Sequence, residues 1–422
     1  MIQPHIKEIE SVSLLNYDKH VLSNGLPVYY INAGKQALVK VDVIFDAGNT
    51  LSSDPVLPAA VNALLNDGTI NFTSEQIALM IDGKGAFYMP DVQKDFSQIS
   101  LYLLNRFAKE LLPLLIEMIT ESVFPQEEID MYKRNMKQRF LVEHEKVNVQ
   151  SYQAFNNALF GIDSNYAENT KAEDYDGLEK SSILEFYQKR VKKSPRYVIV
   201  SGMIDDELKG EIIKNFENID ISAKQESEKI IVFGNSASTK DWIKIPGIDN
   251  NQVSLRIGTP TITSGHKDYW GLSFLTTIVG GYFGSRLNKV IREEKGLTYG
   301  VHGHLTNLKH AGFFSIHAEL NAANWEEAYE AIIDVFNDLK KNKIDNSEVE
   351  MVRRYVKGNL LQSLDGAFSF SSYLRNSLVY SMEENRVNQF INYLDHVKSE
   401  ELILLAEQYL AENNFYKIVA GV

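Results

Sequence analysis

The alternation of apolar and polar residues predicts strands and helices along the first half of the chain. Val39, Val41 and Val43 alternate with polar residues, as in a strand with one buried face. Thr73 and Gln76 form a capping-box signature for the helix that follows them. Further elements are predicted as a hairpin turn at 24–25, helices over 58–67, 106–122 and 126–160, and strands over 86–89 and 96–104.

The second half repeats this plan. It is predicted to contain a strand over 252–259, a helix over 268–294 that glycines interrupt, strands over 297–305 and 311–320, and long helices after them. The ends of the two halves, 182–202 and 401–421, both read as an amphipathic helix, a short turn and a strand. At one constant offset, Tyr197, Ile199, Val200 and Gly202 correspond to Tyr416, Ile418, Val419 and Gly421. The shared offset favours duplication of one unit.

The chain therefore reads as two domains of one plan. Its 422 residues exceed the roughly 250–300 residues at which a single core stops growing. A polar, aperiodic segment between the halves places a boundary near residue 225, which gives domains of 1–225 and 226–422. The pattern predicts an α+β fold in which each domain has an antiparallel or mixed sheet with helices packed mainly on one face.

Composition excludes several classes of function. With 43 basic and 56 acidic residues the net charge is −13, which disfavours binding to nucleic acid or to an anionic membrane. There is no cysteine, so any metal would need His, Asp or Glu ligands. The first twenty residues carry acids and lack the apolar run of a secretory signal, and no apolar stretch reaches the roughly 18–20 residues of a membrane span. A cytoplasmic location is expected.

Two segments resemble the signature of the pitrilysin/insulinase zinc peptidases. Within 47–88, an Ala-Gly pair (47–48) follows a strand, a Gly-Thr pair (68–69) closes the next helix, and a Gly-Ala pair (85–86) ends the helix after that. Residues 280–301 are similar to the family's glycine-rich loop and its Arg/Tyr pair. Together with the repeated plan, the resemblance covers nearly the whole chain. It implies a clamshell of two homologous domains, like that of the mitochondrial processing peptidase.

The residues that would hold zinc in that family are absent here. The family's helix carries H-x-x-E-H, in which two His bind zinc and the Glu is the general base. Anchored on 68–69, these positions fall on Ala59, Asn62 and Ala63. A methyl group cannot ligate a metal and an amide cannot act as a base. The family's third ligand, a Glu, should fall near 138–140, where no carboxylate stands. The resemblance thus implies a chain that binds no zinc and cleaves no peptide alone.

Other histidines offer weaker metal candidates. His302 and His304 lie two apart on a predicted strand, so they share a face and could in principle bind a metal. We interpret them as polar residues on a sheet face or cleft wall. The pair His144-Glu145 lies late in a long helical pattern and is expected to face solvent.

Arg292 and Tyr299 stand at the spacing of the family's Arg/Tyr pair. The resemblance implies that they reach across a cleft, hold substrate and stabilise a tetrahedral intermediate at the zinc of another domain. Arg offers a fixed fork of donors, and a Tyr hydroxyl can donate to an oxyanion. The alternative is that both have only structural roles. The loop before the pair is expected to pack closely and to shape the substrate cleft: Gly280, Gly281, Gly284, Ser285 and Arg286.

Some members of that family work as pairs of two-domain subunits, one with H-x-x-E-H and one that lacks it yet supplies the Arg/Tyr pair. The resemblance implies that this chain is the second kind, the non-catalytic subunit of a heteromeric zinc peptidase that degrades peptides. The zinc would then lie on the homologous partner subunit. Self-association as a dimer stays open. The alternative function is a peptide-binding or structural scaffold protein with no protease role.

Overall fold

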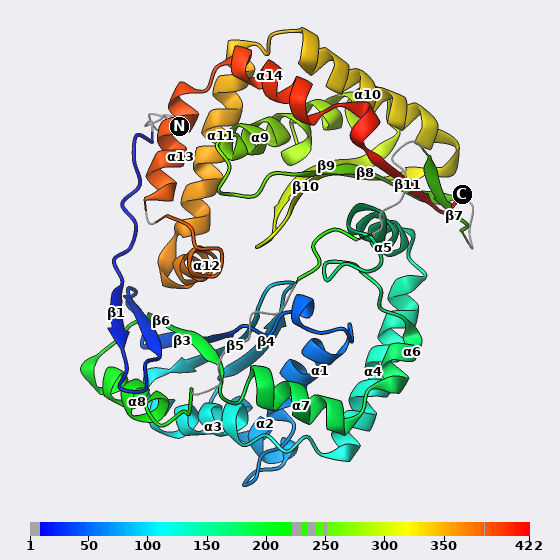
Figure 1. Ribbon diagram of the computed structural model, residues 1–422. Helices are drawn as coiled ribbons and strands as arrows, with labels where there is room; N and C mark the ends of the chain where they lie inside the picture. The colour runs from blue at the N-terminus through cyan, green and yellow to red at the C-terminus, as the bar shows by residue number, and fades with distance from the viewer. Residues whose placement is uncertain (1–8, 222–229, 235–240, 248–250, 384) are drawn as a thin grey trace.

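The computed structural model describes residues 9–221, 230–234, 241–247, 251–383 and 385–422. Two sheets face each other across the molecule, and most helices lie on their outer sides (Figure 1). The strands of the first sheet are β1 (Asp18–Val21), β2 (Pro27–Asn32), β3 (Leu38–Phe45), β4 (Phe87–Val92), β5 (Ser97–Leu104) and β6 (Pro195–Gly202). Those of the second are β7 (Trp242–Ile245), β8 (Gln252–Thr261), β9 (Thr298–Asn307), β10 (Gly312–Asn321) and β11 (Tyr416–Ala420).

Both sheets are mixed. The first runs in the order β1-β2-β6-β3-β5-β4 and the second in the order β7-β11-β8-β10-β9. Only the β2–β6 and β7–β11 pairs are parallel among the strand pairs of the described residues. The order leaves β4 and β9 as open edges of their sheets. The predicted α+β fold of two homologous domains is confirmed.

Each sheet buries one face under helices of its own half. In β3, Val39, Val41 and Val43 are fully buried in the core beneath the outer helices, as their alternation predicts. The helices of the first half are α1 (Leu57–Ala63), α2 (Ser74–Asp82), α3 (Ala108–Thr120), α4 (Gln126–His144), α6 (Ala172–Gly177), α7 (Lys180–Arg190) and α8 (Asp206–Phe216). Those of the second half are α9 (Tyr269–Thr276), α10 (Trp325–Lys341), α11 (Asn346–Leu364), α13 (Arg386–His396) and α14 (Ser399–Tyr409). No helix in these described ranges is long and apolar enough to cross a membrane.

The repeated ends of the halves adopt the same structure. In each, a helix (α7 or α14) leads into a strand (β6 or β11), and a glycine with positive φ is the last residue of β6 and directly follows β11. Gly202 has φ 125° and Gly421 has φ 101°. A Cβ added to Gly202 would lie 2.2 Å from the carbonyl oxygen of Leu38, and one added to Gly421 would lie 2.4 Å from that of Gln252. The same close approach to a neighbouring strand explains why glycine stands at both positions.

The helix predicted over 126–160 is wrong as a single element. It breaks at Lys146, whose backbone is extended (φ −75°, ψ 127°), and continues as α5 (Val147–Phe160). α5 then crosses to the inner face of the second sheet, where Phe155 and Phe160 are buried against residues of β10 and β11 (Figure 1). Gly258 of β8 makes room, because a Cβ there would lie 2.6 Å from the Phe155 ring.

A helix of the second half makes the reciprocal contact. α12 (Gly366–Val379) lies on the inner face of the first sheet, where Phe370 and Leu374 are buried with Ile44 and Ile199. Each sheet thus has an inner helix supplied by the other half, which couples the two halves. The boundary predicted near residue 225 lies outside the described residues.

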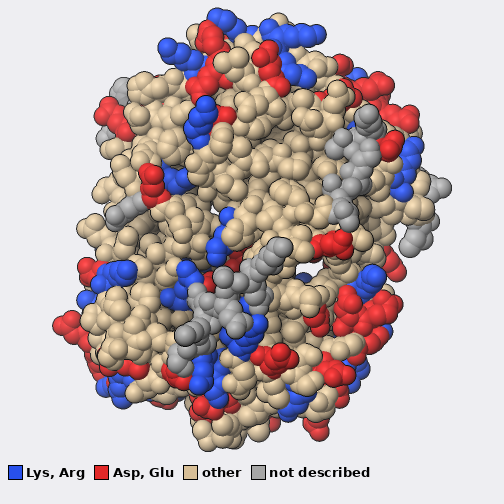
Figure 2. Space-filling model, viewed as in Figure 1, with Lys and Arg blue, Asp and Glu red and all other residues tan. Residues whose placement is uncertain are grey.

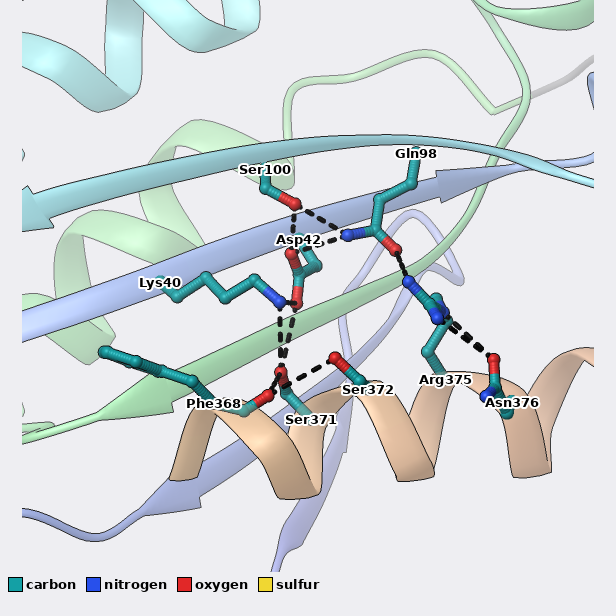
Figure 3. Close-up of polar contacts among 9 residues, drawn as sticks. All are labelled: Lys40, Asp42, Gln98, Ser100, Phe368, Ser371, Ser372, Arg375 and Asn376. Carbon is teal, nitrogen blue, oxygen red and sulfur yellow. Dashed lines mark hydrogen bonds and ion pairs between the residues drawn. The ribbon is translucent and has the colours of Figure 1, made fainter. Parts of the chain in front are cut away.

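A buried polar network fixes α12 to this sheet (Figure 3). The Nζ of Lys40 lies 2.9 Å from Oδ2 of Asp42, with the side chains only 5% and 1% exposed. Ser100 Oγ and Gln98 Nε2 donate to Oδ1 of Asp42 at 2.6 and 2.9 Å. Lys40 also donates to Oγ of Ser371 on α12, at 3.2 Å. Hydrogen bonds between this buried ion pair and Ser371 therefore join one half to the other in the interior.

Candidate functional site

The degenerate zinc helix is α1, and its side chains serve packing. Ala59 and Ala63 are half-buried. Asn62 is buried, and its Nδ2 donates to the backbone carbonyls of Asp91 (3.1 Å) and Gln98 (3.2 Å). The residue at the position of the family's general base thus holds β4 and β5 against α1, which is a structural role.

The position expected for the family's third zinc ligand also lacks a carboxylate. Phe140 of α4 stacks on the ring of His144, with centroids 5.1 Å apart. His144 is half-buried and Glu145 is exposed. Within the described ranges, no three His, Cys, Asp or Glu side chains come together in a way that could hold a metal ion.

Asp67, just after α1, carries an unfavourable charge. Burial and, to a smaller extent, the neighbouring carboxylate of Glu128 together raise its pKa to about 6. In the unfolded chain this carboxyl ionises near pH 4, whereas in the folded chain it keeps its proton up to about pH 6. Stability therefore falls as pH rises from about 4 to about 6, and the loss is complete above that range.

We accordingly expect Asp67→Asn to raise the free energy of unfolding at pH 7.5 by about 1–2 kcal/mol, since solvent near the carboxyl screens part of the penalty. The gain should shrink at pH 4.5. Urea denaturation at both pH values measures it. Asp82→Asn, on the exposed side of α2, is the matched control and should change little at either pH. A gain that does not depend on pH would contradict the assignment.

Arg292 and Tyr299 lie on one open pocket of about 1020 Å³. Arg292 belongs to the π-helical segment η5 (Asn288–Glu294), and Tyr299 to the start of the edge strand β9. The Tyr299 side chain is 97% exposed, so its hydroxyl is available to a ligand. The guanidinium of Arg292 lies 4.4 Å from the centre of the Phe283 ring. No carboxylate of the described chain forms an ion pair with it.

Residues of the glycine-rich loop contact two different parts of the second half. Gly280 packs against β9, since a Cβ there would lie 2.7 Å from the backbone nitrogen of Gly303. Arg286 forms ion pairs with Asp338 (2.6 Å) and Glu348 (2.8 Å) of α10 and α11. Gly284 and Arg286 line a second cavity of about 820 Å³ instead of the pocket that holds Arg292 and Tyr299.

The remaining loop residues have packing environments. Ser285 is fully buried, and its Oγ accepts a hydrogen bond from Nδ2 of Asn288 at 3.1 Å. A Cβ on Gly281 would lie 3.3 Å from the Thr277 side chain. The structure brings the Arg/Tyr pair together, while the loop before it anchors η5 to α10, α11 and β9.

Histidines and an arginine form a row on the inner face of the second sheet. His302 of β9 lies opposite His317 of β10, which lies opposite Arg256 of β8. His304 is on the same face of β9, and its ring centroid is 6.3 Å from that of His302. Burial lowers the pKa of His317 to about 3 and that of Arg256 to about 10, and it also lowers the pKa of His304. The shared face predicted for His302 and His304 is confirmed; His317 and Arg256 were not predicted.

One region of the outer surface is acidic, in contrast to the row of histidines and arginine on the inner face of the second sheet. Figure 2 shows Asp and Glu side chains gathered where α4 and α6 lie in Figure 1, and small openings between the two halves. The sequence of α6, AEDYDG, contributes to this region. The basic row thus lies inside a chain whose net charge is −13.

The fold and the site together define a peptidase-like protein without the H-x-x-E-H motif. A family model described as "Peptidase M16 inactive domain" matches residues 177–356. The chain is thus similar to the M16 peptidases, and in particular to their inactive, peptidase-like type. The resemblance identified in the sequence is confirmed.

Curated relatives are similar over most of the chain, and solved structures share its fold. "Uncharacterized zinc protease YmxG" of Bacillus subtilis is 22% identical over 347 residues, which are 82% of this chain and 83% of that protein. "Probable inactive metalloprotease YmfF" of the same organism is 23% identical over 329 residues, 74% of this chain and 75% of its own. A peptidase M16 inactive domain from Pseudomonas fluorescens superposes with a TM-score of 0.86 at 21% identity, covering 96% of this chain and 98% of that one. A protease from Helicobacter pylori has a TM-score of 0.84 at 16% identity, covering 97% and 100%.

Proposed function

We propose that this chain is the non-catalytic subunit of a heteromeric zinc peptidase, in which Arg292 and Tyr299 complete the site of a partner that bears H-x-x-E-H. One observation carries the proposal. Both side chains border the same open pocket and are available to a ligand, while Ala59, Asn62 and Ala63 leave the chain's own α1 without metal ligands. A chain that presents this pair to a ligand but cannot hold zinc on its own α1 is what a complementing subunit requires.

The proposed chemistry divides between the subunits. The partner's zinc would supply an activated water for attack on the peptide carbonyl. As the carbonyl oxygen gains negative charge, the Tyr299 hydroxyl donates to it and the Arg292 guanidinium holds the substrate through its fork of donors. Tyr299 stands at the exposed start of β9, from which it can reach a second molecule.

Peptides are the proposed substrates. β9 is an open edge of its sheet and borders the same pocket as Arg292 and Tyr299. An open edge presents unpaired backbone N–H and C=O groups, which an extended peptide can pair with. A peptide or short unfolded segment can adopt this extended form without disrupting a fold of its own, so the proposal favours such substrates.

Peptide cleavage tests the proposal. The purified chain with added zinc is expected to be inactive. The chain mixed with an H-x-x-E-H-bearing homologue encoded beside it is expected to cleave, and Arg292→Ala should slow cleavage by this mixture strongly. Release of fluorescence from a quenched peptide measures the rate. If this chain alone cleaved the peptide and a chelator abolished the cleavage, the proposal would be refuted. His302 and His304 would then be the candidates for a metal site. If neither the chain nor the mixture cleaved the peptide, the result would favour a peptide-binding or scaffold role.

A further inference from the structure

The second half contains a further cavity between α9 and α13, the α9–α13 cavity. Its volume is about 670 Å³, within the range of roughly 300–1,000 Å³ that is usual for small-molecule sites. One wall is the turn that leads into α9 (264–267), and the other is formed by 380–383 and by α13. It shares no lining residue with the pocket of Arg292 and Tyr299, so it is a separate place for a ligand.

Arg386, at the start of α13, is held in this cavity by aromatic rings. Its guanidinium carbon lies 5.4 Å from the centre of the Tyr269 ring and 5.7 Å from that of the Trp270 ring. The side chain is half-buried and lines the cavity, and its guanidinium has no hydrogen bond or ion pair in the part of the chain that the structure describes. Contact with ring faces orients a guanidinium while its N–H groups stay free to donate. Arg386 is therefore oriented but still lacks an acceptor.

Two further donors line the cavity from the turn before α9. Lys267 is exposed, and its ammonium group has no acceptor among the described residues. Nδ1 of His266 accepts a hydrogen bond from the backbone N–H of Asp268 at 3.2 Å. In the neutral imidazole the proton is then on Nε2, which can donate. The turn thus adds one positive charge and one neutral donor to the side of the cavity that faces α13.

The two carboxylates near the cavity do not pair with its lysine or arginine. Glu383 is the acidic residue among the described lining residues, and it accepts a hydrogen bond from a glutamine of α13 at 3.0 Å. Asp268 accepts one from the hydroxyl of Tyr409 at 3.0 Å, and its Oδ2 lies 3.8 Å from Nδ1 of His266. With neutral histidines, the described lining residues carry two positive charges and one negative, although the chain as a whole has a net charge of −13.

Aromatic side chains supply the apolar part of the lining. Trp270 of α9 and Tyr393 of α13 both line the cavity, with ring centroids 5.9 Å apart, and Tyr380 lines it as well. The rings of Trp270 and Tyr393 are only half-buried, so part of each ring stays accessible. The cavity is larger than an inorganic oxyanion needs, and aromatic walls favour a ligand that carries a planar ring.

We propose that the α9–α13 cavity binds a small ligand in which an oxyanion, a phosphate or a carboxylate, is joined to an aromatic ring. Arg386, Lys267 and Nε2 of His266 donate to the oxyanion, and the ring lies beside Trp270. A phosphate monoester carries more negative charge than a carboxylate and should gain more from two cations. The site is independent of the proposed peptidase role, since it uses neither Arg292 nor Tyr299.

Isothermal titration calorimetry with the full chain at pH 7.5 and constant ionic strength tests the site. Four probes are compared: phenyl phosphate, benzoate, inorganic phosphate and the uncharged benzyl alcohol. We expect phenyl phosphate to bind about ten-fold more tightly than inorganic phosphate, because the ring adds contact with the aromatic wall. Benzoate should bind less tightly than phenyl phosphate, and benzyl alcohol should give no measurable binding. Tighter binding of benzoate would assign a carboxylate to the site.

Variants locate the binding. Arg386→Gln should weaken binding of phenyl phosphate about ten-fold, because a charge-assisted pair is lost, and Arg386→Lys should keep part of it. Lys267→Gln should weaken it several-fold, and its exposed position puts folding at little risk. The matched control is Arg354→Gln, since Arg354 is an exposed arginine of α11 that pairs with Glu350. Circular dichroism checks that each variant is folded.

Three results would overturn the site. The first is that the wild-type chain binds neither phenyl phosphate nor benzoate, or binds benzyl alcohol as tightly as either of them. The second is that folded Arg386→Gln and Lys267→Gln both bind phenyl phosphate as the wild type does. The third is that Arg354→Gln loses binding as Arg386→Gln does, which would place the anion elsewhere on the chain. None of these results bears on peptide cleavage, so the site and the proposed function stand or fall separately.

Discussion

Replacing Asp42 with alanine is expected to lower the free energy of unfolding by about 3–5 kcal/mol, because it leaves the ammonium group of Lys40 buried without its counter-charge. The ion pair is almost fully enclosed, and Asp42 is also the acceptor for Ser100 and Gln98. Total stabilities are about 5–15 kcal/mol, so the variant should be close to unfolding at moderate temperature. Denaturant midpoints measure the loss.

The same substitution should loosen α12. Lys40 donates to Ser371 on this helix, so disturbance of the ion pair is transmitted across the interface of the two halves. Hydrogen exchange over 366–379 is expected to quicken in Asp42→Ala. The double variant Lys40→Met, Asp42→Ala should recover part of the stability, because no buried charge remains.

An exposed ion pair provides the control. Lys109 and Glu207 lie 2.6 Å apart, but their side chains are 62% and 70% exposed. Pairs of this kind contribute about 0–1 kcal/mol, so Glu207→Ala should hardly move the midpoint. If Asp42→Ala cost no more than Glu207→Ala, the network would be accessible to water in solution and would not fix α12.

Local patterns predicted the strands and most helices well, because their residues alternate or repeat in ways that depend only on near neighbours. The capping box of Thr73 and Gln76 and the hairpin at 24–25 formed as predicted. The break at Lys146 was missed, since neither glycine nor proline marks it and the periodicity on both sides is helical. It arises because Phe155 and Phe160 bury themselves against the other half, which no local pattern reveals.

The candidate site was likewise predictable only in part, because long-range contacts do not appear in local sequence patterns. The resemblance pointed to Arg292 and Tyr299, and the structure places both on one pocket. His317 and Arg256 were missed, because their proximity depends on the register of β10 with β8 and β9. A signal was present: in β8, Arg256 takes a polar position of the alternation, on the face opposite that of the buried Leu255 and Ile257.

In the proposed two-subunit peptidase we expect Arg292→Ala to reduce kcat/KM by about 10²-fold, because the substrate loses the fork of donors that holds it in position. Arg292 can act on substrate because no carboxylate of the described chain pairs with it, and the face of Phe283 holds its guanidinium. Arg292→Lys should restore little, since an ammonium group lacks the planar fork of donors. Tyr299→Phe removes only a hydroxyl at a 97% exposed position, so it should reduce the rate without affecting folding.

The comparison of kcat with KM distinguishes the role of each residue. A donor that acts mainly in the transition state lowers kcat, whereas one that binds ground state and transition state equally raises KM and leaves kcat unchanged. We expect Tyr299→Phe to lower kcat and Arg292→Ala to affect both constants. Arg354 is an arginine of α11 that pairs with Glu350, and it serves as the control. Arg354→Ala should change kcat and KM by less than about two-fold, as most surface substitutions do. Unchanged kinetics of Arg292→Ala in an intact two-subunit assembly would show that the substrate is held without Arg292, and would contradict the role proposed for this residue.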